Sequence, residues 1–161
     1  MTELVAFGHA ILAILFFAGI LGRGIVLALA ERATTIDAMR TLARAAAPFE
    51  WIVIRVGTVA LTLGLATALL QGRPLLGPIQ GGHVDWLFAS IVLLLTAFPL
   101  PPLVVLPRGR IFEAALADAT ARGEITPELQ RAWRDPVTRA AHVWELVVLT
   151  AVLGLMIARP F

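Results

Sequence analysis

The sequence predicts an all-α integral membrane protein, built as a four-helix bundle with short amphipathic helices on its cytoplasmic side. Three observations predict this class. First, 59% of the 161 residues are hydrophobic and only 15% are charged, which lies outside the usual range of soluble domains. Second, several apolar runs approach the roughly 20 residues that a helix needs to cross the hydrocarbon core. Third, the arginines gather in the segments between those runs.

The predicted spans form a single transmembrane domain, and they cover about residues 4–30, 49–70, 86–106 and 136–158. The first span contains several glycines, which membrane helices tolerate because small residues let neighbouring helices approach closely. The sequence contains no cysteine, which excludes disulfides, thiolate metal sites and cysteine nucleophiles.

Residues 31–48, which follow the first span, predict a short amphipathic helix at the membrane interface. Its apolar residues recur at helical spacing and its arginines take the other side: Ile36, Met39, Leu42 and Ala43 against Arg40 and Arg44. Pro48 is then expected to begin the second span, and Trp51 stands where an interfacial anchor belongs.

The second and third spans are joined by residues 71–85, whose glycines and prolines predict a loop. The second half of the third span is also rich in proline. Proline lacks a backbone N–H and interrupts a helix. We therefore expect the helix to falter near Phe98 and the chain to leave the membrane in an extended segment.

Residues 108–135 are the most polar part of the chain, and they predict two short helices. The first ends near Gly123, because glycine favours the conformation that closes a helix. The second begins with Thr126 as its cap and Pro127 in its first helical position. Asp135 is expected to cap the fourth span in the same way.

The distribution of arginine predicts the orientation. Residues 31–48 and 107–136 carry eight arginines, whereas the opposite side carries Arg73 and Arg159. This asymmetry follows the positive-inside rule and places both long loops in the cytoplasm. We therefore expect a multi-pass protein of the bacterial cytoplasmic (inner) membrane, with both termini on the outer side.

A carboxylate inside the fourth span, Glu145, is the most informative single residue. An ionised side chain in hydrocarbon is costly, so it usually faces the bundle interior and pairs. Helical rise places Arg23 and Arg55 in the same layer of the cytoplasmic leaflet, so we expect Glu145 to pair with one or both. His142 lies one turn away and could extend the cluster. Three interpretations remain open: a fixed ion-pair cluster, a binding site for an anionic or protonatable ligand, and snorkelling to the interface.

The histidines are the candidate cofactor ligands. His9 and His142 are separated by most of the membrane and cannot both ligate one haem iron. His9 and His83 lie on the same side, which makes them the candidate pair. His9 is interpreted either as a neutral ring bonded to a neighbouring helix or as a ligand of haem b. We expect no dedicated metal site.

Several stretches resemble a widespread bacterial family of predicted integral membrane proteins of unknown function. They are HAILAILFFAG in the first span, WLFASIVLLL at the start of the third, a long loop with a polar helix, and the final LMIARPF. Members of that family typically end the fourth helix with a basic residue and proline. The resemblance implies the same four-helix architecture over nearly the whole chain.

The layout is more distantly similar to HemJ-type protoporphyrinogen oxidases and CopD-type copper-resistance proteins. The HemJ resemblance implies haem near His9 and makes Arg159-Pro160-Phe161 the counterpart of a terminal Lys-Pro-Phe. The fourth span departs from the HemJ pattern, because Arg139 is followed by AAHVWEL rather than by an Asn-Glu-x-Pro stretch.

Two classes of function follow. The first is a non-catalytic accessory or scaffold component that packs against the helices of other membrane subunits or of a homo-oligomer. The second is a haem-binding redox protein or HemJ-like oxidase that uses His9. A transporter is a third interpretation, which four spans without internal symmetry do not favour. The lipid bilayer is the common partner, and nucleic acid is not expected because no soluble basic face is visible.

Overall fold

The computed structural model describes residues 1–160. The predicted terminal motif is therefore described as far as Pro160, and Phe161 lies outside the described residues. The prediction of an all-α protein is confirmed, because four helical segments are long and apolar enough to cross a membrane. The elements are α1 (Thr2–Glu31), α2 (Ile36–Leu70), the 3-10 helix η1 (Gly77–Gln80), α3 (Trp86–Ala97), the π-helix η2 (Pro101–Val105), α4 (Leu106–Arg122), α5 (Pro127–Trp133) and α6 (Pro136–Ala158).

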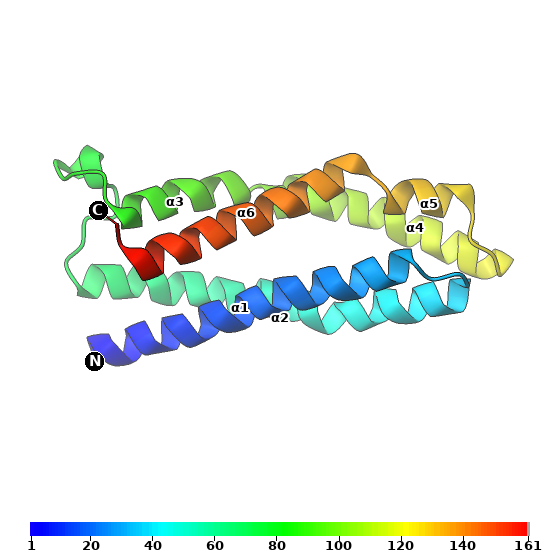
Figure 1. The fold of residues 1–161 in the computed structure, drawn as a ribbon, viewed down its shortest axis with the longest axis horizontal. Helices are drawn as coiled ribbons and strands as arrows, with labels where there is room; N and C mark the ends of the chain where they lie inside the picture. The colour runs from blue at the N-terminus through cyan, green and yellow to red at the C-terminus, as the bar shows by residue number, and fades with distance from the viewer. Residues whose placement is uncertain (161) are drawn as a thin grey trace.

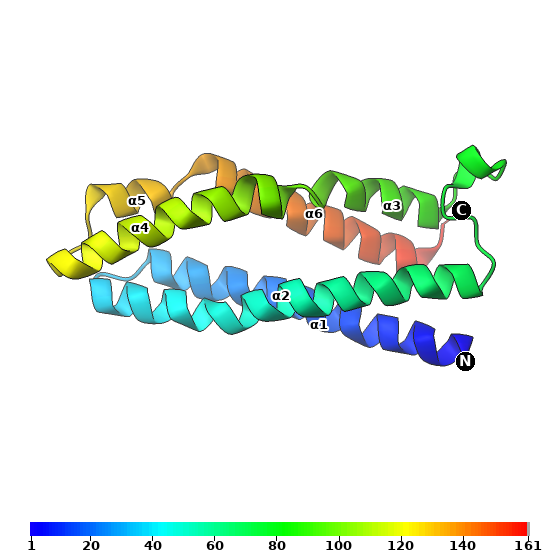
Figure 2. The ribbon, with the colours of Figure 1, turned by 180° about the vertical axis from the view of Figure 1, so that it is seen from behind.

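The helices form two antiparallel pairs that run along one long axis (Figure 1). Helix α1 packs on α2, and α3 packs on α6, while α4 and α5 pack on each other. Both termini and the loop that holds η1 lie at one end, and the α1–α2 and α4–α5 turns lie at the other (Figures 1 and 2). The two termini therefore share one end of the bundle, as an even number of crossings requires.

Helix α2 corrects the expectation of a separate interfacial helix at residues 31–48. It runs without interruption from Ile36 to Leu70, and Pro48 lies inside it rather than at its start. The apolar face around Ile36 and Met39 is buried against protein instead of lying on the bilayer. A proline removes one N–H donor from the helix, and α2 continues through Pro48 with buried residues before and after it, Ala46 and Ala60. The 35 residues rise about 52 Å, so α2 extends beyond a hydrocarbon core of about 30 Å.

The proline-rich stretch gives one confirmed prediction and one wrong one. Helix α3 ends at Ala97, next to the expected break at Phe98. The expected extended segment is wrong, because the chain continues through the π-helical turn η2 into α4. Prolines cannot donate to the ordinary i−4 carbonyl, so the turn widens and the Leu106 N–H reaches the carbonyl of Pro101.

The predicted helix ends around α4, α5 and α6 are confirmed. The Thr126 hydroxyl accepts a bond from the Leu129 N–H at the start of α5, and the Asp135 carboxylate accepts one from Thr138 at the start of α6. Helix α4 ends at Arg122 and is capped by Gly123, which has a left-handed φ of 72° that glycine adopts at little cost.

The α1–α2 contact is close because glycines line it. Each of these glycines lies against a side chain of the other helix: Gly8, Gly19, Gly22, Gly57 and Gly64. At Gly57, an added Cβ would lie 2.6 Å from Cε2 of Phe16, which is closer than real contacts allow. The α1–α2 pair is therefore built around small residues.

Two apolar clusters hold the remaining elements together. One lies at the end of the bundle that holds the α4–α5 turn and joins α2 to α4 and α5 through Ile36, Met39, Ala119 and Leu129. The other joins α3 to α6 through Ala97, Val148 and Val152. The first cluster therefore joins the α1–α2 pair to the two helices that pack on each other, α4 and α5.

We predict that Gly57→Leu destabilises the protein, because the new side chain overlaps Phe16 and must force α1 and α2 apart. Overpacking of this kind costs about 1–3 kcal/mol, so the thermal unfolding temperature in mild detergent should fall clearly.

Gly24→Leu is the matched control, because nothing lies within 4 Å of a Cβ added at that helical glycine. It should unfold at or above the wild-type temperature. Equal losses in the two variants would show that the glycine contact does not hold the pair together.

Candidate functional site

Three polar side chains from two helices meet inside the bundle, and we call them the triad: Arg23 of α1 with His142 and Glu145 of α6. The Nη2 atom of Arg23 lies 2.9 Å from Nδ1 of His142 and 3.9 Å from Oε2 of Glu145. Nδ1 of His142 lies 3.6 Å from the same carboxylate oxygen. The side chains of Arg23 and Glu145 are each only 13% exposed.

The geometry assigns the roles of donor and acceptor. A guanidinium can only donate hydrogen bonds, so Nδ1 of His142 accepts one from Arg23 and the ring proton lies on Nε2. The imidazole is then neutral, and Glu145 supplies the negative charge that balances Arg23. The triad thus joins α1 to α6 through one hydrogen bond and one ion pair.

A second charged layer lies toward the end of the bundle that holds the α4–α5 turn. Oε1 of Glu31 lies 3.2 Å from Nη2 of Arg139 and 3.9 Å from Nε of Arg134. Eight residues separate Arg23 from Glu31 on α1, and six separate Arg139 from Glu145 on α6. These steps correspond to about 12 Å and 9 Å of helical rise. Two ion-pair layers at similar spacing therefore set the register of α1 against α6.

Of the two arginines expected as partners of Glu145, Arg23 lies in the triad and Arg55 does not. Its side chain is exposed, and among residues 1–160 no ion pair includes it. Helix α2 packs on α1 through Ala60, which is buried, and Arg55 lies five residues earlier. Five residues turn a helix by about 140°, so Arg55 points away from the face that packs on α1.

His9 is seated against α2. Its Nδ1 atom lies 2.8 Å from the carbonyl oxygen of Ala60, so Nδ1–H donates to that oxygen. A Cβ added at Gly64 would lie 2.8 Å from Cε1 of the ring, which shows how closely the imidazole covers this glycine. His83 is exposed in the loop between η1 and α3. Within the described chain, no group of three or more acidic or histidine side chains could hold a metal ion.

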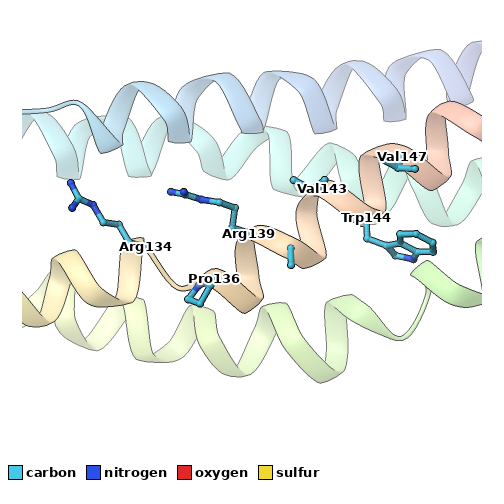
Figure 3. A pocket seen from close by; sticks show the side chains of 7 residues that line it. Arg134, Pro136, Arg139, Val143, Trp144 and Val147 are labelled. Carbon is cyan, nitrogen blue, oxygen red and sulfur yellow. The ribbon is translucent and has the colours of Figure 1, made fainter.

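An open groove of about 490 Å³ runs along α6, and sequence reasoning did not predict it. Two arginines stand at one end and apolar side chains follow: Arg134, Pro136, Arg139, Ala140, Val143, Trp144 and Val147. In Figure 3, Arg134 and Arg139 reach toward α1 and α2, while Trp144 points toward the break between α3 and α4. The Trp144 indole N–H donates to the Thr96 hydroxyl at 3.2 Å.

The layer formed by Glu31, Arg134 and Arg139 was also missed. The sequence did contain a signal for it, because Glu31 and Arg139 have opposite charges and both lie at the cytoplasmic ends of their predicted spans. The groove carried no comparable signal, since it depends on the turn between α5 and α6.

A comparison with known families matches residues 3–160 to a family described as "Predicted integral membrane protein (DUF2269)". No curated protein and no solved structure matches the chain. The expected resemblance to the family of predicted integral membrane proteins is thus confirmed. The more distant resemblance to HemJ-type and CopD-type proteins finds no support in these comparisons.

We predict that Glu145→Gln destabilises the fold, because it leaves the Arg23 guanidinium opposite a neutral amide and a neutral imidazole. Removing one partner of a buried ion pair costs about 3–5 kcal/mol, which should appear as a lower unfolding temperature in detergent.

Arg55→Gln serves as the control, because it also removes one charge from a span but its side chain is exposed. It should change the free energy of unfolding by no more than about 0.5 kcal/mol. An unchanged unfolding temperature for Glu145→Gln would contradict a stabilising role for the triad.

Proposed function

The chain belongs to the family of predicted integral membrane proteins designated DUF2269, and from this premise we propose that it is a non-catalytic accessory or scaffold component. In this role its helices pack against those of partner membrane proteins or of a second copy. The observation that supports the proposal best is a glycine-containing face of α6 that no other part of the described chain covers.

The glycines of the membrane helices differ in what faces them. Those of the α1–α2 interface each meet a side chain of the neighbouring helix, whereas nothing lies within 4 Å of a Cβ added at Gly24 of α1 or at Gly154 of α6. Small residues serve membrane helices by letting another backbone come close. Gly154 has no such neighbour within the described chain, which favours a partner helix from outside it.

Gly154 is part of a longer small-residue face. Thr150, Gly154 and Ala158 recur every four residues and are all exposed. This spacing places them on one side of α6, in the small-xxx-small pattern that supports close helix pairs in membranes. The triad is compatible with a structural role, because its three members satisfy one another and hold α6 against α1.

The charge distribution supports an inner-membrane location with both termini outside. The two arginine-rich segments lie at the end of the bundle that holds the α1–α2 and α4–α5 turns, and the termini lie at the other end (Figure 1). Such a separation is what the positive-inside rule describes. The proposal therefore places the α4–α5 turn in the cytoplasm.

We predict that Gly154→Leu weakens association with the partner while the protein itself remains folded. The leucine side chain would hold the partner backbone away from α6, so the amount of partner or second copy recovered should fall about tenfold or more. The measurement is a quantitative pull-down from native membranes in mild detergent, together with the oligomeric state of the purified protein.

Gly109→Leu is the matched control, because it is the same substitution at a helical glycine of α4 with nothing within 4 Å of an added Cβ, and the residues four positions before and after it, Val105 and Glu113, are not small. It should leave association unchanged. The proposal would be wrong if Gly154→Leu associated as well as wild type, or if the wild-type protein were monomeric and recovered no partner.

A haem-binding role at His9 is the second candidate, and one observation favours it. Because Nδ1–H donates to the Ala60 carbonyl, the lone pair of Nε2 is left to act as a ligand. Metal-ligating histidines commonly donate their other ring nitrogen to a carbonyl in this way. This candidate would make the protein a membrane redox protein rather than a scaffold.

An absorbance spectrum of the purified protein tests this candidate. A haem protein would show a Soret band that His9→Ala abolishes, while His83→Ala shows whether the exposed loop histidine contributes. A colourless wild-type protein, purified from cells supplied with haem, would exclude the candidate.

A further inference from the structure

We propose that the groove along α6 binds one anionic phospholipid, with Arg134 and Arg139 at its phosphate and Val143, Trp144 and Val147 along an acyl chain. This goes beyond the accessory role, since it requires no partner protein. Two chemically different ends of the groove carry the inference.

The arginine end of the groove has an excess of positive charge. Arg134 and Arg139 face one carboxylate, Glu31, whose Oε1 atom they share. The other nearby acid, Asp135, is already held by Arg108 at 2.6 Å. The Arg134 and Arg139 side chains are 69% and 61% exposed, so most of their N–H donors remain open to a ligand. One net positive charge and a set of forked donors match a phosphodiester.

The other end of the groove is apolar. Val143, Val147 and Ala140 offer no polar side-chain atom, and the Trp144 indole N–H is already bonded to Thr96. From Arg139 to Val147 is about 12 Å of helical rise, which leads from headgroup depth into the hydrocarbon. The groove therefore changes from cationic to apolar in the direction in which a phospholipid does.

This match favours a lipid over other occupants. A free phosphate ion would use the arginines and leave the valines and Trp144 uncovered. A partner helix would cover the apolar wall but would need an acid of its own at the level of Arg134 and Arg139. An anionic phospholipid supplies both halves, and the cytoplasmic leaflet that the orientation assigns to this end is rich in negative charge.

Native mass spectrometry of the full chain in mild detergent tests the proposal, with phosphatidylglycerol and phosphatidylcholine as the two probes. We expect one phosphatidylglycerol to remain bound, phosphatidylcholine to be lost, and inorganic phosphate not to displace the bound lipid. Equal retention of both lipids, or displacement by phosphate, would overturn the proposal.

Variants locate the binding. The double variant Arg134→Gln/Arg139→Gln should bind phosphatidylglycerol roughly 30-fold more weakly, since each arginine near an anionic headgroup contributes about fivefold. The charge-matched control is Arg122→Gln/Arg131→Gln, whose arginines pair with Asp118 and Glu128 away from the groove. Equal weakening in the control would mean that net charge, not the groove, retains the lipid, and would overturn the site.

Glu31→Gln is a second variant that tests the role of the two arginines if the double variant folds poorly. It removes the competing carboxylate and leaves both arginines in place, so phosphatidylglycerol should bind several-fold more tightly. Unchanged or weaker binding in this variant would contradict the proposed role of the two arginines.

Discussion

The constraint on which the structure depends is that ionised side chains in hydrocarbon must meet one another. Arg23 and Glu145 come from the first and last helices, and each would be costly alone in the membrane. Their contact, together with the hydrogen bond from Arg23 to His142, joins the α1–α2 pair to the α3–α6 pair. An ion pair and a hydrogen bond thus hold the two helix pairs together inside the bundle.

The packing within each pair has a different origin. Glycines bring α1 and α2 into close contact, whereas Ala97, Val148 and Val152 join α3 to α6 through aliphatic side chains. A further cluster, around Met39 and Leu129, joins α2 to α4 and α5 at the end that holds the α4–α5 turn. Lipid offers little hydrophobic drive for helix association, so buried polar contacts carry more of the specificity inside the membrane.

The sequence predicted features that depend on a few neighbouring residues better than features that depend on how helices pack against one another. Local signals succeeded, since a cap such as Thr126 or a break near Phe98 follows from a few neighbouring residues. Depth along a helix was also readable, and it placed Arg23 and Glu145 at one level. The side of the helix on which a residue lies could not be predicted. Arg55 was therefore expected at the same depth as Glu145, but its side chain is exposed. The prediction that a span begins at Pro48 was wrong, because α2 continues through this proline. The buried residues on both sides of it belong to contacts that the local sequence does not reveal.

The most direct test of the triad as the link between the two helix pairs is a charge exchange. Arg23→Glu and Glu145→Arg should each lower the thermal unfolding temperature in detergent, because each leaves two like charges together inside the bundle. The two changes combined restore an opposite pair across the same contact, and they should recover most of the lost stability. A combined variant that is no more stable than the weaker single one would contradict the link.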